Sequence, residues 1–399
     1  MRPRDLLSKW DNLLFLVFIF AVLFRQVWLI AFAVAVSVVF TAARVWNYYA
    51  LSRISYRRLW RYRRGFPGET LSVRILTANE KLLPLPWLRT TDPWPLAVGP
   101  QDETLLSPSH IADQGNLVNM YSLRWFEKVE RAVALQLRQR GIYDLGPTQL
   151  QSGDPFGMFD NTVEHDNQEY LTVFPEVLPL ERLKLDAEDP FGDRRARRRL
   201  VEDPTLPIGV RDYHPEDDFR HIHWPATARS GQMQVRMFQP VSSQVMVVCL
   251  NVSTAEQPWL GTYHSMLEQL VKVTATLVVH GVEDGYAVGL ISNGCLAHAD
   301  RPFRILPGRS RDQLSLLLQT LAAVTPYTTT PFEKYLVKAA SNLPYGATLL
   351  IVTALVTPAL LETLISIRRY RTHTTLICLQ AAPPPTIPGV RVLHLPFSP

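Results

Sequence analysis

Two apolar runs near the N-terminus limit what this chain can fold into more than any other feature. Leu13–Phe24 and Val27–Ala43 are separated only by Arg25-Gln26. One continuous membrane helix would place an arginine near the bilayer centre, at a cost of about 2.5–3.5 kcal/mol. The pattern therefore predicts a transmembrane helical hairpin that turns at Arg25-Gln26.

Basic side chains flank both runs. Residues 1–64 contain eleven Arg or Lys and two Asp, a local charge of +9, whereas the other residues contain 30 basic and 34 acidic side chains. Because positive flanks prefer the cytoplasmic side, we expect a two-helix, multi-pass protein of the cell membrane with its bulk in the cytoplasm. A cleavable signal peptide is disfavoured, since no small-residue cleavage site lies between the two runs. The mildly acidic remainder also argues against nucleic acid as a partner.

Three segments are expected after the membrane hairpin and the basic juxtamembrane segment, which together span residues 1–64. Residues 65–180 alternate with period two between Pro and Gly breaks, which predicts an all-β, sandwich-like domain. Residues 181–231 form a linker. Residues 232–399 alternate strand and helix patterns, which predicts an α/β domain with a mostly parallel sheet and with ligands at the carboxyl ends of its strands.

The linker ends in the stretch GVRDYHPEDDFRHIHWPATARSG, residues 209–231. Three histidines and an aspartate in it, His214, His221, His223 and Asp217, could ligate zinc. We interpret FRHIHW as a strand, with His221 and His223 on one face. No matching Cys/His cluster occurs elsewhere in the sequence, so structural histidines are the favoured interpretation.

An ion-pair network is the preferred role of this stretch, because its arginines keep the neighbouring carboxylates ionised. Together with aromatic side chains such a network would fix the junction between the β-domain and the α/β domain. The residues assigned to it are Arg211, Tyr213, Asp217, Arg220, His223, Trp224 and Arg229. The preceding cluster Arg194–Arg199 is interpreted as a solvated loop, with anionic lipid headgroups as the alternative ligand.

The order of hairpin, β-domain, signature and α/β domain resembles a bacterial family, domain of unknown function fifty-eight. The family signature runs Arg-x-Tyr-x-x-Gly-Asp-x-x-Arg-x-Ile-x-Trp, then Ala-Arg. It is matched here by Arg211, Tyr213, Asp217, Arg220, Ile222, Trp224, Ala228 and Arg229, whereas Glu216 stands where the family usually has glycine. The resemblance covers nearly the whole chain and implies association with a MoxR-type AAA+ ATPase.

The C-terminal domain is similar to von Willebrand factor type A domains, whose metal site is Asp-x-Ser-x-Ser with a threonine and an aspartate from later loops. Here the first loop reads NVSTA, so Asn251 replaces the aspartate, Ser253 remains and Ala255 removes a hydroxyl. Thr353-Ala354 occupies the later aspartate region, and Thr328–Thr330 could supply the threonine. A hard cation needs carboxylate oxygens, so we expect a degenerate site with no metal and no other cofactor.

These interpretations predict a non-enzymatic, membrane-anchored scaffold or adaptor for a cytoplasmic protein partner. Docking is expected at the strand-end loops Asn251–Gln257 and Thr353–Pro358, with Trp259 as a candidate anchor. The sequence has no Gly-x-Ser-x-Gly nucleophile elbow. The alternative from a different class is a metal-dependent hydrolase that uses His214, His221 and His223.

Overall fold

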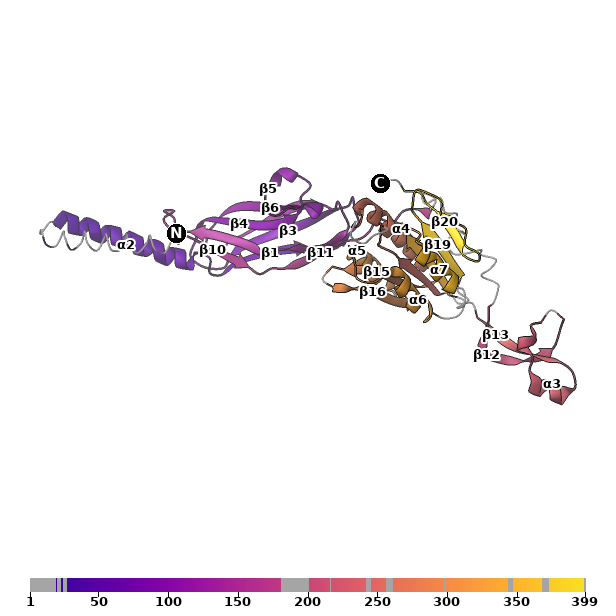
Figure 1. The fold of residues 1–399 in the computed structure, drawn as a ribbon. Helices are drawn as coiled ribbons and strands as arrows, with labels where there is room; N and C mark the ends of the chain where they lie inside the picture. The colour runs from indigo at the N-terminus through magenta and orange to yellow at the C-terminus, as the bar shows by residue number, and fades with distance from the viewer. Residues whose placement is uncertain are drawn as a thin grey trace. The chain divides into compact units, whose positions relative to one another are not determined.

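The chain has 399 residues, and its computed structural model describes residues 19, 23, 27–180, 201–215, 217–241, 245–255, 261–297, 299–343, 347–367 and 373–397. It divides into two compact units (Figure 1). The first comprises Met1–Gln139 and Tyr143–Val173, and the second comprises Arg140–Ile142 and Phe174–Pro399.

The first unit begins with one long apolar helix, α2 (Val27–Ala50). At 1.5 Å per residue its 24 residues extend for about 36 Å, more than the hydrocarbon thickness of about 30 Å. By length and composition α2 is a candidate membrane-spanning helix. The second predicted run is thus helical and continues past Ala43, whereas the first run lies outside the described residues apart from Ile19 and Leu23.

The C-terminal half of α2 contacts the β-domain that follows it. The rings of Phe40 and Phe159 meet edge to face with centroids 6.1 Å apart, and the Arg44 guanidinium lies 5.9 Å from the centroid of the same Phe159 ring. These contacts fix the end of α2 against the turn before strand β10.

The β-domain of the first unit contains three sheets. The strand orders are β1-β3-β7, β10-β9-β4-β6-β5 and β2-β11-β8. All pairs are antiparallel where the register is defined, except the parallel pair of β11 and β2. The strands are β1 (Ile54–Trp60), β2 (Arg64–Gly65), β3 (Thr70–Asn79), β4 (Leu85–Pro95), β5 (Leu106–Pro108), β6 (Gln114–Leu123), β7 (Lys128–Gln136), β8 (Gly141–Leu145), β9 (Thr148–Gly153), β10 (Asp160–His165) and β11 (Glu169–Val173), with 3-10 turns η1 (Leu96–Val98) and η2 (Glu103–Leu105).

The β-domain begins eleven residues earlier than its predicted start at residue 65, because β1 starts at Ile54. Strand β1 therefore includes part of the run Arg57–Arg64, which the sequence assigned to a basic juxtamembrane flank. Alternation along β1 turns Tyr56 and Arg58 into the interior, where both are buried, and leaves Arg57 exposed. One of these arginines is thus a core residue.

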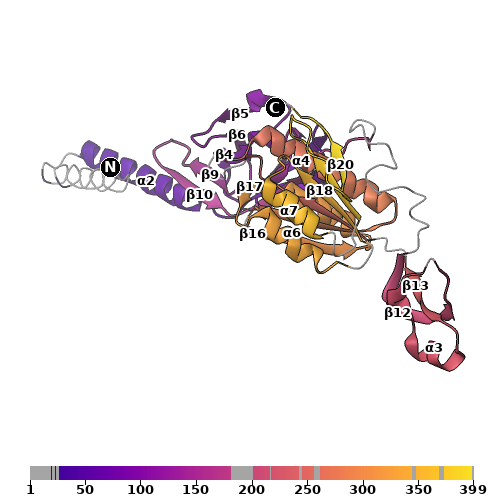
Figure 2. The same cartoon turned by 45° about the vertical axis from the view of Figure 1, so that its right-hand side comes forward.

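The second unit contains a mixed sheet of order β16-β15-β14-β18-β19-β20, with β17 paired to β15 (Figure 2). Strands β15, β14, β18, β19 and β20 are parallel to one another, and β16 and β17 run antiparallel to β15. The strands are β14 (Val245–Leu250), β15 (Ala287–Leu296), β16 (Ala299–Gly308), β17 (Val324–Thr328), β18 (Thr348–Thr353), β19 (His373–Cys378) and β20 (Arg391–His394).

Helices cover both faces of this sheet (Figure 2). They are α4 (His264–Glu283), α5 (Gln313–Ala322), α6 (Phe332–Ala340) and α7 (Pro358–Ile367). On one face Val247 and Cys249 share an apolar cluster with Leu336 of α6 and Leu364 of α7. Met246 points to the other face, where its side chain lies so close to Gly281 of α4 that a Cβ there would meet the methionine methyl.

The alternation in residues 232–399 predicts strands at 243–250, 285–292, 347–356 and 373–379, which correspond to β14, β15, β18 and β19. It predicts helices at 263–282, 310–324, 331–343 and 358–371, which correspond to α4, α5, α6 and, as far as residue 367, α7. Strands β16, β17 and β20 were not predicted. The fold therefore agrees with the expected mostly parallel sheet, with an additional antiparallel edge at β16.

Candidate functional site

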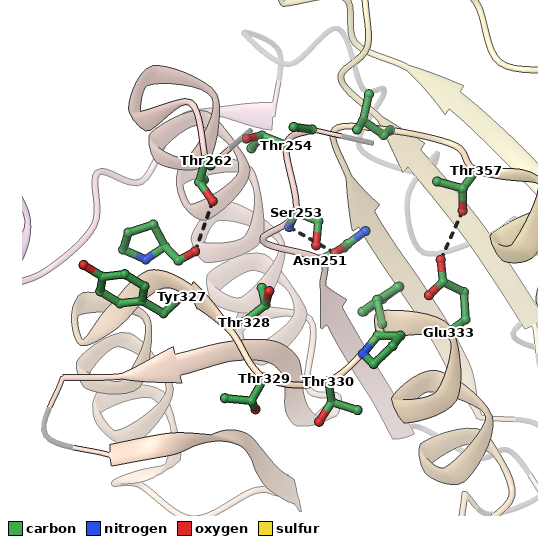
Figure 3. Close-up of a pocket in the computed structure, with 16 residues that line it drawn as sticks. Asn251, Ser253, Thr254, Thr262, Tyr327, Thr328, Thr329, Thr330, Glu333 and Thr357 are labelled. Carbon is green, nitrogen blue, oxygen red and sulfur yellow. Dashed lines mark hydrogen bonds between the residues drawn. The ribbon is translucent and has the colours of Figure 1, made fainter. Parts of the chain in front are cut away.

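A cavity of about 630 Å³ opens beside the end of β14, where the chain leaves the sheet (Figure 3). Its wall is formed by the segments that follow β14 and β18, by the end of β17 with the loop after it, and by the start of α6. It is lined by Asn251, Ser253, Thr254, Ala255, Gly261, Thr262, Pro326, Tyr327, Thr328, Thr329, Thr330, Pro331, Phe332, Glu333, Leu355 and Thr357.

A hydrogen-bonded network of neutral side chains holds the base of the cavity. Asn251 Oδ1 accepts from the Ser253 amide and from Asn293 Nδ2, each at 3.1 Å, while Asn251 Nδ2 donates to Thr353 Oγ1 at 3.1 Å. The Thr353 hydroxyl donates to the Leu355 carbonyl at 2.7 Å. Asn251, Asn293 and Thr353 are all buried. Because they lie at or near the carboxyl ends of β14, β15 and β18, the network connects three neighbouring parallel strands.

The sequence identified Asn251, Ser253 and Thr353 as the degenerate loop, and the structure brings all three together. It did not identify Asn293, which joins them by donating to Asn251 and to Ser253 Oγ at 3.3 Å. Asn293 also accepts from the Val252 amide at 3.0 Å. A signal for it existed, because Asn293 is a polar residue within the buried run of β15, toward the carboxyl end of the strand, where such folds carry functional side chains.

The threonine run contributes one side chain that is directed toward this network. In Figure 3 Thr328 points toward Ser253, whereas Thr329 and Thr330 point away from it. No side-chain hydrogen bond is formed by these three hydroxyls within the part of the chain that the structure describes. Thr328 is thus the member of the run that is directed toward the network.

Among the lining residues that the structure describes, one carries a carboxylate, namely Glu333 at the second position of α6. The Thr357 hydroxyl donates to Glu333 Oε1 at 3.1 Å (Figure 3). A hard dication requires several oxygens with carboxylates among them. Here Asn251 directs an amide donor at Thr353, so the donor set does not fit such an ion.

The docking loops predicted from the sequence are described in part. Residues 251–255 and 353–358 lie in described segments, and Asn251, Leu355 and Thr357 line the cavity. Trp259, the candidate anchor, lies outside the described residues, as do Gln257 and the rest of 256–260.

The signature stretch forms a separate small element of the second unit. Strands β12 (Val201–Asp212) and β13 (Gln234–Val241) pair antiparallel, and the segment between them carries the turn η5 (Phe219–His221) and helix α3 (Trp224–Ser230). Gly231, with φ +72°, ends α3 in the left-handed conformation that glycine adopts without strain.

The interpretation of FRHIHW as a strand was wrong. Its first residues form η5, only Ile222 makes an isolated bridge to Val235, and His223 caps α3. Asp218 explains the difference, because its side chain accepts from the Arg220 amide and starts the turn. His221 and His223 are therefore not alternate residues of a sheet.

Arg211 and Asp217 form the main ion pair of the signature. Arg211 donates to both carboxylate oxygens, at 2.6 Å to Oδ2 and 2.5 Å to Oδ1, and the His214 amide donates to Oδ2 at 2.8 Å. These bonds from Arg211, followed by the His214 amide, lower the pKa of Asp217 to about 2. The Arg211 side chain is 41% exposed, so the pair lies at the surface.

The other signature residues have separate local roles. The rings of Tyr213 and Phe219 pack with centroids 5.5 Å apart. His223 Nδ1 accepts from the Ala226 amide at 3.0 Å, and Trp224 is 67% exposed. Arg220 and Arg229 are exposed, and neither forms an ion pair with any residue in the described segments.

The zinc alternative gains no support from this geometry. His223 Nδ1 is committed to capping α3, which leaves one ring nitrogen. Within the described ranges, no three His, Cys, Asp or Glu side chains are grouped to hold a metal ion. Glu216 and Arg194–Arg199 lie outside those ranges.

Several solved structures resemble fragments of the chain at low TM-scores. A cohesin module from a Clostridium perfringens family 33 glycoside hydrolase is 10% identical, with 30% of this chain and 95% of that chain covered and a TM-score of 0.22. The sporulation control protein Spo0M from Bacillus subtilis is 10% identical, with 31% and 50% covered and a TM-score of 0.20.

Sequence comparison is more informative. The uncharacterized protein YeaD of Bacillus subtilis (strain 168) is 21% identical over 171 residues, 43% of this chain. The match spans 41% of that relative's length. Residues 209–392, which include the signature and nearly all of the α/β domain, match the family described as Protein of unknown function DUF58.

Proposed function

We propose that this chain is a non-enzymatic, membrane-anchored adaptor that docks a cytoplasmic protein partner at the cavity beside β14. The observation that carries the proposal is the neutral network at its base. Where a type A domain would place metal-binding carboxylates, Asn251 and Thr353 are hydrogen-bonded to each other at 3.1 Å. The loop is thus shaped by its own side chains and still presents a concave surface at the strand ends.

The strand order supports assigning a type A-like fold to the second unit. Strand β17 lies off the main strand order and is left out of the numbering here. If the six other strands are numbered in chain order, β16-β15-β14-β18-β19-β20 is the doubly wound order 3-2-1-4-5-6, with the third strand antiparallel. In such sheets ligands bind outside the carboxyl ends, at the point where the order reverses. That point is β14, and the cavity lies beside its end.

Membrane attachment through a two-helix hairpin is the second part of the proposal. Helix α2 supplies one apolar span, and the run Leu13–Phe24 would supply the other. Basic residues on both flanks favour a cytoplasmic position for both ends. The cavity would then face partners in the cytoplasm.

A MoxR-type AAA+ ATPase is the partner that we propose, on the strength of the family resemblance. A photo-crosslinking residue at Tyr327, which lines the cavity and is 73% exposed, tests it in native membranes. The matched control is Leu316 of α5, which is exposed and does not line the cavity. We expect an ATPase to crosslink from Tyr327 and not from Leu316. Crosslinks to lipid or to the chain itself alone, or equal yields from both positions, would refute the adaptor.

A further inference from the structure

The charge inside the cavity is unbalanced. Of the sixteen described residues that line it, fifteen carry neutral side chains and Glu333 carries a carboxylate; none of the sixteen is Lys, Arg or His. Glu333 is half-buried and forms no ion pair with any described residue. A concave site with low-dielectric walls and one unpaired charge attracts an opposite charge more strongly than an open surface does.

The carboxylate is held in place and still has capacity to bind. Its Oε1 accepts one hydrogen bond, from Thr357, whose own oxygen accepts from the Leu360 amide at 3.2 Å. No hydrogen bond to Oε2 occurs among the described residues. An ionised carboxylate offers about four acceptor positions, so most of them face the cavity or water.

The remaining wall suits a side chain that is apolar along its length and cationic at its end. Thr328 contributes a hydroxyl that can accept a hydrogen bond. Tyr327 contributes an aromatic ring, and a cation is attracted to the face of such a ring. Pro326, Pro331 and Leu355 provide apolar surface for a methylene chain. A cavity of about 630 Å³ exceeds one side chain, so it has room for a short extended segment as well.

We infer that this cavity receives a lysine or arginine side chain presented by the docked partner, with Glu333 as its counter-ion. The inference rests on the proposed adaptor function and specifies its chemistry. A partner carboxylate is disfavoured because it would meet Glu333 without a metal ion between them. A hard dication is disfavoured because Glu333 is the single carboxylate among the described residues that line the cavity.

Two capped pentapeptides that differ only at the central residue, arginine in one and glutamate in the other, provide the test. Each is titrated against the full-length protein in detergent and followed by ligand-observed NMR. We expect saturable binding of the arginine peptide at least about tenfold tighter than that of the glutamate peptide, because a hydrogen bond to a charged group has this size. Glu333→Gln should remove the preference. Glu362→Gln on the exposed side of α7 is the matched control and should keep it.

Glu333→Asp keeps the charge and should retain part of the preference, which separates loss of charge from loss of folding. Equal binding of both peptides, an unchanged preference in Glu333→Gln with a parental melting temperature, or Mg²⁺-dependent binding of the glutamate peptide would each overturn the inference. Repeating the Tyr327 crosslinking on Glu333→Gln separates the two proposals. A persistent ATPase crosslink refutes the cationic contact alone, whereas a Glu333-dependent arginine preference without any ATPase crosslink refutes the adaptor alone.

Discussion

Arg58 and Asp92 form a bidentate ion pair inside the β-domain. Arg58 Nε lies 3.0 Å from Asp92 Oδ2, Nη2 contacts Oδ1, and neither side chain is exposed. Tyr56 and Trp94 also donate to Oδ2, at 2.9 and 3.0 Å. Burial, followed by the nearby Asp92 carboxylate, raises the pKa of Tyr56 far above its ordinary value, so its hydroxyl stays protonated and keeps donating.

We predict that Asp92→Ala lowers the free energy of unfolding by about 3–5 kcal/mol, because it removes the buried partner of the Arg58 guanidinium and leaves Glu169 Oε2, at the longer distance of 3.8 Å, as its nearby carboxylate. Urea denaturation of the full chain measures the effect. The control is Arg74→Ala, which removes an ion pair to Glu130 in which both side chains are exposed and should cost at most about 1 kcal/mol. Equal effects of the two substitutions would show that burial does not govern the Arg58 pair.

The sequence could not reveal this pair, although it revealed much of the fold. Strand and helix patterns in residues 245–378 were strong enough to place β14, β15, β18, β19 and the helices between them. Arg58 lies in a run of arginines that satisfies every expectation for a basic membrane flank. Only its partner Asp92, thirty-four residues away on a strand of a different sheet, shows that this arginine points inward.

The sequence predicted several residues of the candidate site, but it did not reveal the other residues that they contact. Asn251, Ser253 and Thr353 were found because a family pattern marks their positions, whereas Asn293 has no place in that pattern. Glu333 was missed for a different reason. It looks like an ordinary acidic residue in the first turn of a helix, and only the fold places it beside the end of β14.

A second prediction concerns the acid range. The folded-state pKa of Asp217, about 2, lies below its ordinary value of 3.8, so its contribution to stability is present above pH 3.8 and is lost as the pH falls through 2. Titration of carbon-13-labelled aspartate by NMR should therefore find Asp217 still ionised at pH 3. Arg211→Ala should move its pKa up toward 3.8, whereas Arg229→Ala should not. A shift with Arg229→Ala instead would reassign the ion pair.

A third prediction tests the proposal that the loop after β14 is a degenerate metal site. The parent chain should show no saturable Mg²⁺ isotherm in the millimolar range by calorimetry. The triple substitution Asn251→Asp, Ala255→Ser and Thr353→Asp restores the missing oxygens, and its melting temperature should rise when Mg²⁺ is added, as ligand binding to the folded state requires. Asn251→Asp alone is the control and should respond weakly. Mg²⁺ binding by the parent chain would contradict the assignment of a degenerate site.

A fourth prediction concerns topology. Reporter domains fused before residue 1 and after residue 399 should both report the cytoplasm if Leu13–Phe24 and α2 each cross the membrane. Protease protection in sealed spheroplasts provides an independent measurement. Reporters on opposite sides would show that α2 crosses alone and would remove the hairpin.

The amide and hydroxyl groups that join Asn251, Asn293 and Thr353 do not ionise within the physiological pH range. A loop whose shape depends on a bound ion can be switched by the supply of that ion, but a loop held by these groups takes its shape when the chain folds and keeps it. Divalent ion levels in the cell would then have no control over docking here. Any timing of the contact would have to come from the other side, through the abundance of the partner or, for an ATPase, through the nucleotide that it holds.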